Sequence, residues 1–422
     1  MNPATYDRLN QAAPLIMHID LNSAFATTEQ QAHPSLREKP IGVTNRLSPE
    51  CCVLAASYEA KALGIKGGMR LSEARALCPE LIVLESDAPK YSQVYQKLIR
   101  IMRDYSPNIK MKSIDEGVLD FHGMEAVLKG RTLIDIGHEI RGRVEEDMGE
   151  WMKINIGIGP NRFLAKQAAG WHKPSGTDQL DHTTLMEYYK QIELTDLTGI
   201  AERNAARLNA YGIMTPLQFV GASEYTLKKG VFRGITGTYW YRRLRGYEID
   251  DRDTRLGMIG RQWVVKDPTA SAPYLDSCLS YLCETTGMKL RYRAVEARGI
   301  CVWMRLRSGE SWQARRLHKS PFYTNQEVYR RALELFRSRP SGAVVTTMGL
   351  YCYHLAPSSR SQPSMFEDVE RTEWLTQAVD EINDFYGAFT VHQATSMTGR
   401  QFIKQKIPFG GTEYFDLLLK RA

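Results

Sequence analysis

Apolar and polar positions in the first part of the chain follow the order of a split βαβ unit. Residues 15–22 form a short apolar run that predicts a strand, and residues 91–102 carry apolar side chains at the spacing of a helix. Further strands at 110–114, 118–121 and 152–158 and a helix at 133–144 complete the order βαββαβ. This order predicts an antiparallel sheet with two helices on one face, interrupted after its first strand by an insertion at residues 32–87.

A second stretch, residues 258–355, repeats this plan without repeating the sequence. Its predicted strands are 259–265, 300–306, 311–316 and 343–353, and its predicted helices are 274–291 and 325–338. Residues 182–245 indicate short helices, and the polar segment 246–257 is typical of a linker. The segment APSSRSQPS, which begins at Ala356, is typical of a mobile connection, and a helix is expected at 373–386.

Composition limits the class of protein. The chain has 422 residues, of which 43% are hydrophobic and 24% charged, as in folded globular proteins and unlike disordered or fibrous chains. No apolar run approaches the roughly 18 residues of a membrane helix, and there is no secretion signal. Its 7 cysteines form no CxxC pair, which favours reduced thiols over disulfides or a zinc site. We therefore expect a cytoplasmic protein without a membrane partner.

The positive charge is concentrated in the second βαββαβ stretch. Residues 258–355 contain 15 Lys and Arg and 7 Asp and Glu, a balance of +8, whereas the whole chain carries +7. The rest of the chain therefore sums to −1. A basic module on a neutral body favours a polyanionic partner such as nucleic acid, and a solvated basic face is the alternative.

Three carboxylates are predicted to meet at one edge of the first sheet. Asp20 ends the first strand, while Asp115 and Glu116 lie at the turn between the second and third. Clustered carboxylates are tolerated where hard cations neutralise them, and two Mg²⁺ ions roughly 4 Å apart form the clamp used in phosphoryl transfer. From this pattern alone, solvated turn acids remain the alternative.

Four motifs in this order carry a resemblance to a known family. They are HIDLNSAFATTEQ from His18, SYEAKALGIKGGM from Ser57, SIDEGVLDF from Ser113 and IGIGPNRFLAKQAAGWHKPSG from Ile156. Together they resemble the motifs of the Y-family, or translesion, DNA polymerases, over roughly residues 14–355. The resemblance implies an α+β, multidomain right-hand polymerase with a βαββαβ palm, inserted fingers, a helical thumb and a C-terminal βαββαβ little finger.

The resemblance also implies the roles of individual residues. The metal ligands would be Asp20, Asp115 and Glu116 with the backbone carbonyl of Leu21, holding two Mg²⁺ ions for which Mn²⁺ substitutes. The residues that contact the incoming triphosphate would be Tyr58, Lys61 and Lys173, whose hydroxyl and ammonium groups suit a highly charged leaving group. Phe25 matches the aromatic steric gate beneath the sugar. The sequence departs from the family at Ala24, which replaces an aromatic beside that gate.

Two further segments resemble elements that bind other macromolecules. The segment from Leu197 through Gly199 and Ala201 resembles a helix-hairpin-helix, whose backbone N–H groups bind a DNA phosphate, although a second glycine is common where Ala201 stands. Gln362, Met365 and Phe366 resemble a sliding-clamp peptide. An ordinary packing element and plain linker sequence are the respective alternatives.

The sequence thus predicts a translesion DNA polymerase that adds dNTPs to the 3'-hydroxyl of a primer-template DNA and releases pyrophosphate. We expect a monomer, associated with the nucleoid. The domains would be a palm (1–31 and 88–176), fingers (32–87), a thumb (177–245), a linker (246–257), a little finger (258–355) and a tail (356–422). A catalytically silent DNA-binding relative and a nucleotide cyclase are the alternatives. A silent relative would have lost the carboxylates, and a cyclase would not need the basic module.

Overall fold

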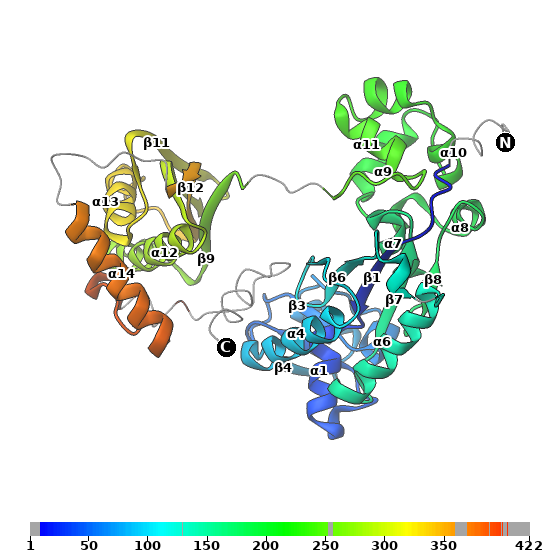
Figure 1. Cartoon of the computed structure of the whole chain (residues 1–422). Coiled ribbons are helices and arrows are strands. Elements are labelled where there is room, and N and C mark those ends of the chain that lie inside the picture. Colours follow the sequence, from blue (N-terminus) through cyan, green and yellow to red (C-terminus); the bar gives the residue numbers. More distant parts are fainter. Residues whose placement is uncertain are drawn as a thin grey trace. The chain divides into compact units, whose positions relative to one another are not determined.

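The computed structural model describes residues 9–128, 130–251, 256–358, 369–387, 389–397, 399 and 403. In sequence these residues divide into two compact units, residues 9–251 and residues 256–403, and Figure 1 shows the elements of each. Within the described residues no helix is long and apolar enough to cross a membrane. Because each unit has its own hydrophobic core, we describe each by itself.

A five-stranded sheet forms the centre of the first unit. Its strands run in the order β5 (Ile109–Met111), β6 (Glu116–Asp120), β1 (Ile16–Leu21), β7 (Ile154–Gly159) and β8 (Thr177–Gln179). The β5–β6, β6–β1 and β1–β7 pairs are antiparallel and the β7–β8 pair is parallel. The expected βαββαβ order is therefore present, with β8 as an additional edge strand.

The helices of this sheet lie on both faces. α4 (Ala88–Arg103) and α6 (Leu133–Met148) bury apolar side chains against Ile19, Leu119 and Ile156 on one face. α7 (Arg162–Trp171) covers the other face, where Ala165 packs with Ile16 and Val118. The expectation of two helices on one face is correct for α4 and α6, and α7 adds a third helix on the opposite face.

The turn between β5 and β6 differs from its predicted position. Sequence alternation placed Glu116 in the turn, whereas Glu116 is the first residue of β6 and is paired directly with Asp20 of β1. The strand begins early because the Glu116 carbonyl accepts hydrogen bonds from the backbone N–H groups of Lys112 and Ser113, at 2.9 and 3.2 Å. These bonds close the hairpin around Asp115.

Two smaller substructures complete the first unit. The insertion forms a three-stranded sheet, in the order β3 (Val53–Ala56), β2 (Ile41–Thr44) and β4 (Ile82–Glu85), with α2 (Tyr58–Ala62) and α3 (Leu71–Leu77) beside it. α1 (Ala24–Ala32) connects β1 to this sheet.

Beyond β8 the chain forms short helices, as predicted: α8 (Leu185–Gln191), α9 (Glu202–Asn209), α10 (Pro216–Gly221) and α11 (Ile235–Arg243). They pack around the buried ring of Trp240.

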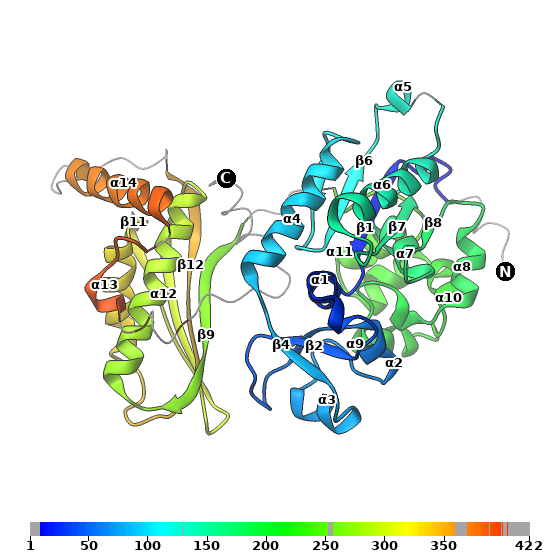
Figure 2. The same cartoon turned by 90° about the horizontal axis from the view of Figure 1, so that it is seen from below.

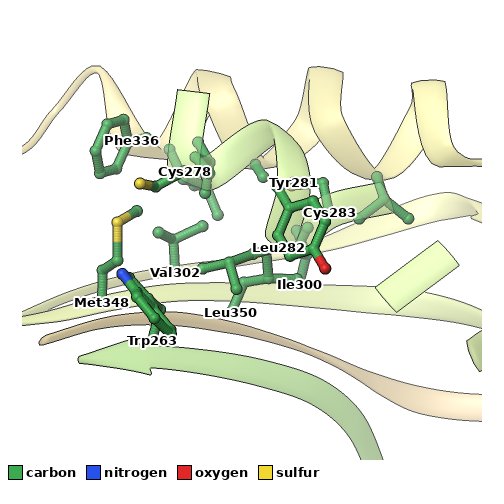
Figure 3. Close-up of a cluster of buried hydrophobic side chains, with 14 of the residues drawn as sticks. Trp263, Cys278, Tyr281, Leu282, Cys283, Ile300, Val302, Phe336, Met348 and Leu350 are labelled. Atoms are coloured by element: carbon green, nitrogen blue, oxygen red, sulfur yellow. The ribbon is translucent and has the colours of Figure 1, made fainter. Parts of the chain in front are cut away.

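The second unit is a four-stranded antiparallel sheet with helices on one face. The strands run in the order β11 (Ser311–Phe322), β10 (Val295–Leu306), β12 (Val345–Pro357) and β9 (Met258–Thr269). α12 (Ala272–Tyr292) and α13 (Asn325–Phe336) cover one face, as Figure 2 shows, and α14 (Val369–Tyr386) follows. Figure 3 shows this core, in which Trp263, Ile300 and Val302 point from the strands toward Cys278 and Leu282 of α12. The strands are longer than predicted because backbone pairing continues past the apolar alternation.

The close packing of α7 on β7 depends on Gly157. A Cβ atom at this position would lie 2.0 Å from the Ala165 carbonyl oxygen and 2.1 Å from the Ala169 nitrogen. These neighbours are backbone atoms of α7, which cannot move aside as the end of a flexible side chain can. Only glycine at position 157 therefore allows α7 to pack this close to β7. The same helix carries Lys166 toward Glu116.

We predict that Gly157→Ala lowers the free energy of unfolding by about 1–3 kcal/mol, the usual cost of overpacking. Urea unfolding measures the change. Gly142→Ala is the matched control, because Gly142 is exposed on α6 and a Cβ there would meet nothing within 4 Å. It should raise the stability by about 0.5–1 kcal/mol, the helix preference for alanine. Equal effects of the two substitutions would contradict this account of the α7–β7 contact.

Candidate active site

Three acidic residues meet at one end of the β1–β6 pair. Asp20 and Glu116 are directly opposite in the antiparallel register, so their side chains leave the same face of the sheet. Asp115 precedes Glu116, and its carbonyl oxygen accepts a hydrogen bond from the Leu21 N–H at 2.8 Å. This bond fixes the backbone at Leu21 beside the carboxylates. The predicted convergence of strand end and hairpin is therefore present.

The electrostatics of the three carboxylates differ because their partners differ. Burial, followed by the neighbouring charges of Asp20 and Glu116, raises the pKa of Asp115, which accepts a hydrogen bond from the Ser113 hydroxyl. Burial also acts to raise the pKa of Glu116, but hydrogen bonds from His18 and Lys166 outweigh it and hold that pKa at about 2. Glu116 therefore remains ionised at neutral pH, whereas burial and the neighbouring carboxylates oppose the ionisation of Asp115.

Two lysines supply positive charge to this cluster. The Lys173 ammonium lies 2.8 Å from Asp20 Oδ2, and the Lys166 ammonium lies 2.7 Å from Glu116 Oε2. With each carboxylate turned to its own lysine or hydroxyl, no three His, Cys, Asp or Glu side chains of the described residues are arranged as ligands of one ion. The donor set nevertheless fits a hard cation, because carboxylate and carbonyl oxygens are the ligands such ions take.

The loop that carries Lys173 is held by Asn155 of β7. Asn155 is opposite Asp20 in the β1–β7 register. Its Oδ1 accepts a hydrogen bond from the Ser175 N–H at 2.9 Å, and its Nδ2 donates to the His172 carbonyl at 3.3 Å. The buried amide thereby fixes the backbone on both sides of Lys173 and directs its ammonium group to Asp20.

Tyr58 and Lys61 lie on α2 and face the same cluster. Ser57 caps this helix by accepting a hydrogen bond from the Ala60 N–H at 3.3 Å. The Lys61 ammonium donates to Ser23 Oγ at 2.7 Å and lies 4.8 Å from the centre of the Tyr58 ring. Burial and the nearby charge of Lys173 lower the pKa of Lys61. Burial and the charge of Asp20 raise the pKa of Tyr58 to about 12, so its hydroxyl stays protonated at neutral pH.

Phe25 lies on α1 and stacks on Tyr91 of α4. The ring centroids are 4.5 Å apart with an interplanar angle of 18°. The Tyr91 hydroxyl donates a hydrogen bond to Glu29 at 2.8 Å, and Lys90 pairs with the other Glu29 oxygen at 2.7 Å. The ring beneath Phe25 is therefore anchored by a buried charge pair, which limits how far Phe25 can move away from the neighbouring cluster despite the small Ala24.

The remaining predicted binding residues belong to other parts of the chain. Gly199 has a φ of +95°, and Ala201 is the N-terminal capping residue of α9, without a side-chain cap. Both lie among the short helices that follow β8. The predicted clamp residues Gln362, Met365 and Phe366 lie outside the described residues.

Sequence reasoning missed several residues of this cluster. Lys166 stands within the fourth motif and Asn155 directly precedes it, but only the packing of α7 and the register of β7 show that Lys166 contacts Glu116 and that Asn155 supports the Lys173 loop. His18, whose Nε2 lies 3.3 Å from Glu116, reads in the sequence as an ordinary strand residue. A polar side chain at a strand position that should face a helix was the available signal for both His18 and Asn155.

Comparisons with known proteins cover both units. Residues 19–170 match the impB/mucB/samB family, and residues 259–365 match the C-terminal domain of the same family. DNA polymerase IV of Moorella thermoacetica is 31% identical over 393 residues, covering 91% of this chain and 96% of that protein. DNA polymerase IV of Pelotomaculum thermopropionicum is 29% identical over 398 residues, covering 93% and 97%.

Solved structures show the same fold. A Y-family DNA polymerase chimera of Dbh and Dpo4 aligns with a TM-score of 0.68, at 21% identity, over 80% of this chain and 98% of that chain. An insertion ternary complex of Dbh DNA polymerase aligns with a TM-score of 0.57, at the same identity and coverage. The predicted α+β class with a C-terminal sheet domain is confirmed by these alignments.

We predict that Lys166→Met raises the pKa of Glu116, because burial remains while a hydrogen bond and a positive charge are lost. A carboxyl group with a depressed folded-state pKa stabilises the fold above its unfolded pKa of about 4.3, and this contribution is lost as pH falls toward the folded value. The stability difference between wild type and variant should therefore be constant near neutral pH and shrink below about pH 4. Urea unfolding at several pH values measures it.

Lys190→Met is the matched control, since Lys190 pairs with the exposed Glu187 on α8. An exposed pair contributes little to stability, so this variant should show no comparable pH-dependent difference. A Lys166 variant whose deficit stayed constant at low pH would contradict the electrostatic role assigned to Lys166.

Proposed function

The chain belongs to the impB/mucB/samB family of Y-family DNA polymerases, and we propose that it joins dNTPs to a primer 3'-hydroxyl at the β1–β6 carboxylates. It is a DNA-directed DNA polymerase of the translesion type. The observation that carries the assignment of the site is the convergence of Asp20, Asp115 and Glu116 beside Lys61 and Lys173. Negative groups able to hold cations and positive groups able to hold phosphates stand next to one another, as phosphoryl transfer requires.

The carboxylates would hold two Mg²⁺ ions, or Mn²⁺ in their place, together with the backbone carbonyl of Leu21. When bound, such ions neutralise charge on the transferred phosphoryl group and assist the attacking and leaving oxygens. The low pKa of Glu116 keeps this ligand ionised at any physiological pH. The raised pKa of Asp115 reflects a buried group whose charge needs a nearby cation.

Tyr58, Lys61 and Lys173 would bind the triphosphate of the incoming nucleotide. Lys61 now contacts Ser23 and Lys173 now contacts Asp20, and a phosphate oxygen can replace either side chain. Lys173 would then exchange Asp20 for the phosphate, and Lys61 would exchange Ser23. Their ammonium groups would stabilise the negative charge that develops on the departing pyrophosphate.

Phe25 would select deoxynucleotides by occupying the volume of a 2'-hydroxyl. Its stacking on Tyr91, which is itself tied to Glu29, holds the ring in one place. A fixed ring is needed, because a side chain that could rotate aside would not exclude the larger sugar. Besides this stacking, Phe25 packs against an apolar cluster that includes Ile41 and Tyr95.

The other domains would hold the DNA and the clamp. We assign the palm to residues 1–31 and 88–176, the fingers to 32–87, the thumb to 177–245 and the little finger to 258–355. Gly199 and Ala201 would offer backbone N–H groups to a DNA phosphate in the thumb. Gln362, Met365 and Phe366 would bind a sliding clamp. We expect the chain to work as a monomer and to copy past damaged template bases.

We predict that Asp20→Ala and Asp115→Asn each reduce primer extension at least about a hundredfold. Even the loss of a residue that only hydrogen-bonds to a metal ligand lowers metal affinity or activity roughly 10- to 100-fold. Binding of primer-template DNA should change little, because other domains hold the DNA. Extension on undamaged and abasic templates with Mg²⁺ measures the first effect, and fluorescence anisotropy measures the second. Asp104→Asn, at an exposed carboxylate paired with Arg143, is the matched control and should extend normally. Robust extension by either site variant would overturn the assignment.

We predict that Phe25→Ala raises the efficiency of rCTP incorporation relative to dCTP on the order of a hundredfold, because positional errors of about 1 Å have effects of that size. The measurement is the ratio of kcat/KM for the two nucleotides opposite template G. Phe385→Ala, which removes a ring that is 81% exposed on α14, is the matched control. If the ratio is unchanged while dCTP is still incorporated, Phe25 is a packing residue.

A further inference from the structure

His18 of β1 is a buried polar residue in an otherwise apolar layer. In the register of the sheet it lies between Val118 of β6 and Gly157 of β7, and its side chain is only 2% exposed. Ile16 and Val118 leave the same face and pack with Ala165 of α7, the helix that covers this face. An apolar side chain would complete this layer, so packing alone does not account for an imidazole here.

Only one nitrogen of the His18 ring has a polar partner. Nε2 lies 3.3 Å from Glu116 Oε2, whereas Nδ1 is buried and has no hydrogen-bond partner among the residues that the structure describes. A buried polar atom without a partner destabilises a fold. The imidazole is therefore costly for the core, and its single polar contact goes to a candidate metal ligand.

The ring is confined where α7 crosses the sheet. Gly157 lies directly opposite His18, and a Cβ atom at Gly157 would lie 2.0 Å from the Ala165 carbonyl oxygen. The backbone of α7 therefore lies close against the strand beside the ring. Asp20 follows His18 by two residues and leaves the same face of β1, so the ring belongs to the row of side chains that ends at the carboxylates.

Two donors from different elements bind the same oxygen of Glu116. The Lys166 ammonium of α7 donates to Oε2 at 2.7 Å, and the His18 Nε2 of β1 contacts that oxygen as well. Among the described residues, no side chain donates a hydrogen bond to Oε1. Because the two oxygens of a carboxylate are rigidly joined, donors that fix Oε2 from two elements also fix the position of Oε1.

We propose that His18 is a positioning residue, which holds Glu116 Oε2 together with Lys166 so that Oε1 is presented to the divalent cation. Lys166 alone supplies the charge but not the geometry, since its ammonium stands on a flexible stem and can follow a moving carboxylate. A packed ring cannot follow it. Outer partners of this kind orient the ligands of metal ions. The inference rests on the proposed function, which requires the cation.

The first experiment measures Mn²⁺ binding to the full chain without DNA or nucleotide, from the electron paramagnetic resonance signal of the free ion. Asp20→Ala defines the part of the binding that depends on the carboxylates. His18→Leu should weaken that part on the order of tenfold, the effect of losing an outer partner of a metal ligand. Its urea midpoint should not fall, because leucine fits the apolar layer and removes the unpartnered nitrogen.

Two further variants separate the N–H group from the bulk of the ring. His18→Gln keeps an N–H donor of similar reach and should retain most of the Mn²⁺ affinity, a rescue that a purely structural role would not give. His138→Leu is the matched control, because His138 is exposed on α6, and it should bind like the wild type. An unchanged affinity in His18→Leu, or an equal loss in His18→Leu and His18→Gln, would overturn the proposal.

Primer extension provides a second readout. In His18→Leu the Mg²⁺ concentration for half-maximal extension should rise about tenfold, while KM for dCTP at saturating Mg²⁺ should stay unchanged, because other residues hold the triphosphate. A loss of kcat/KM that is equal at all Mg²⁺ concentrations would contradict the positioning role. Absent extension by the wild type, or equal Mn²⁺ binding by the wild type and Asp20→Ala, would instead reject the proposed function.

Discussion

The direct pairing of Asp20 with Glu116 across β1 and β6 is the constraint on which the site depends. Antiparallel register places the two carboxylates on one face, and the hairpin adds Asp115 next to them. Such a cluster is stable only with positive charge close by, which Lys173 and Lys166 supply. Each lysine reaches its carboxylate because a neighbouring element is held in position, the Lys173 loop by Asn155 and α7 by its contact with Gly157.

This arrangement links fold stability to chemistry. The glycine that lets α7 approach β7 also brings the Lys166 ammonium to Glu116, and this contact helps to keep the Glu116 carboxylate ionised. Lys173 offsets the negative charge of Asp20. Under the proposed function the Lys173–Asp20 pair would open when substrate binds, since partly exposed pairs cost little to open, whereas the Lys166–Glu116 pair would remain.

The second unit differs from the first in its charge. Residues 258–355 carry a balance of +8, whereas the rest of the chain sums to −1. Its helices α12 and α13 bury one face of the four-stranded sheet, where Ile300, Val302 and Leu350 belong to the core. Charge acts at long range and without regard to sequence, so we expect added salt to weaken any binding of nucleic acid by this unit.

The sequence by itself determined the βαββαβ order of both units, the carboxylates at the strand end, and the family. Hydrophobic periodicity and sequence motifs depend on residues that are close together in the chain, so they can be recognised without a structure. Tertiary structure alone decided the partners: that Glu116 begins a strand opposite Asp20, that Lys166 reaches Glu116, and that Phe25 rests on Tyr91. These contacts join residues about 50 to 100 positions apart, and register and helix packing fix them. No pattern along the chain encodes which side of a sheet a distant helix will cover, so those pairings had to be observed.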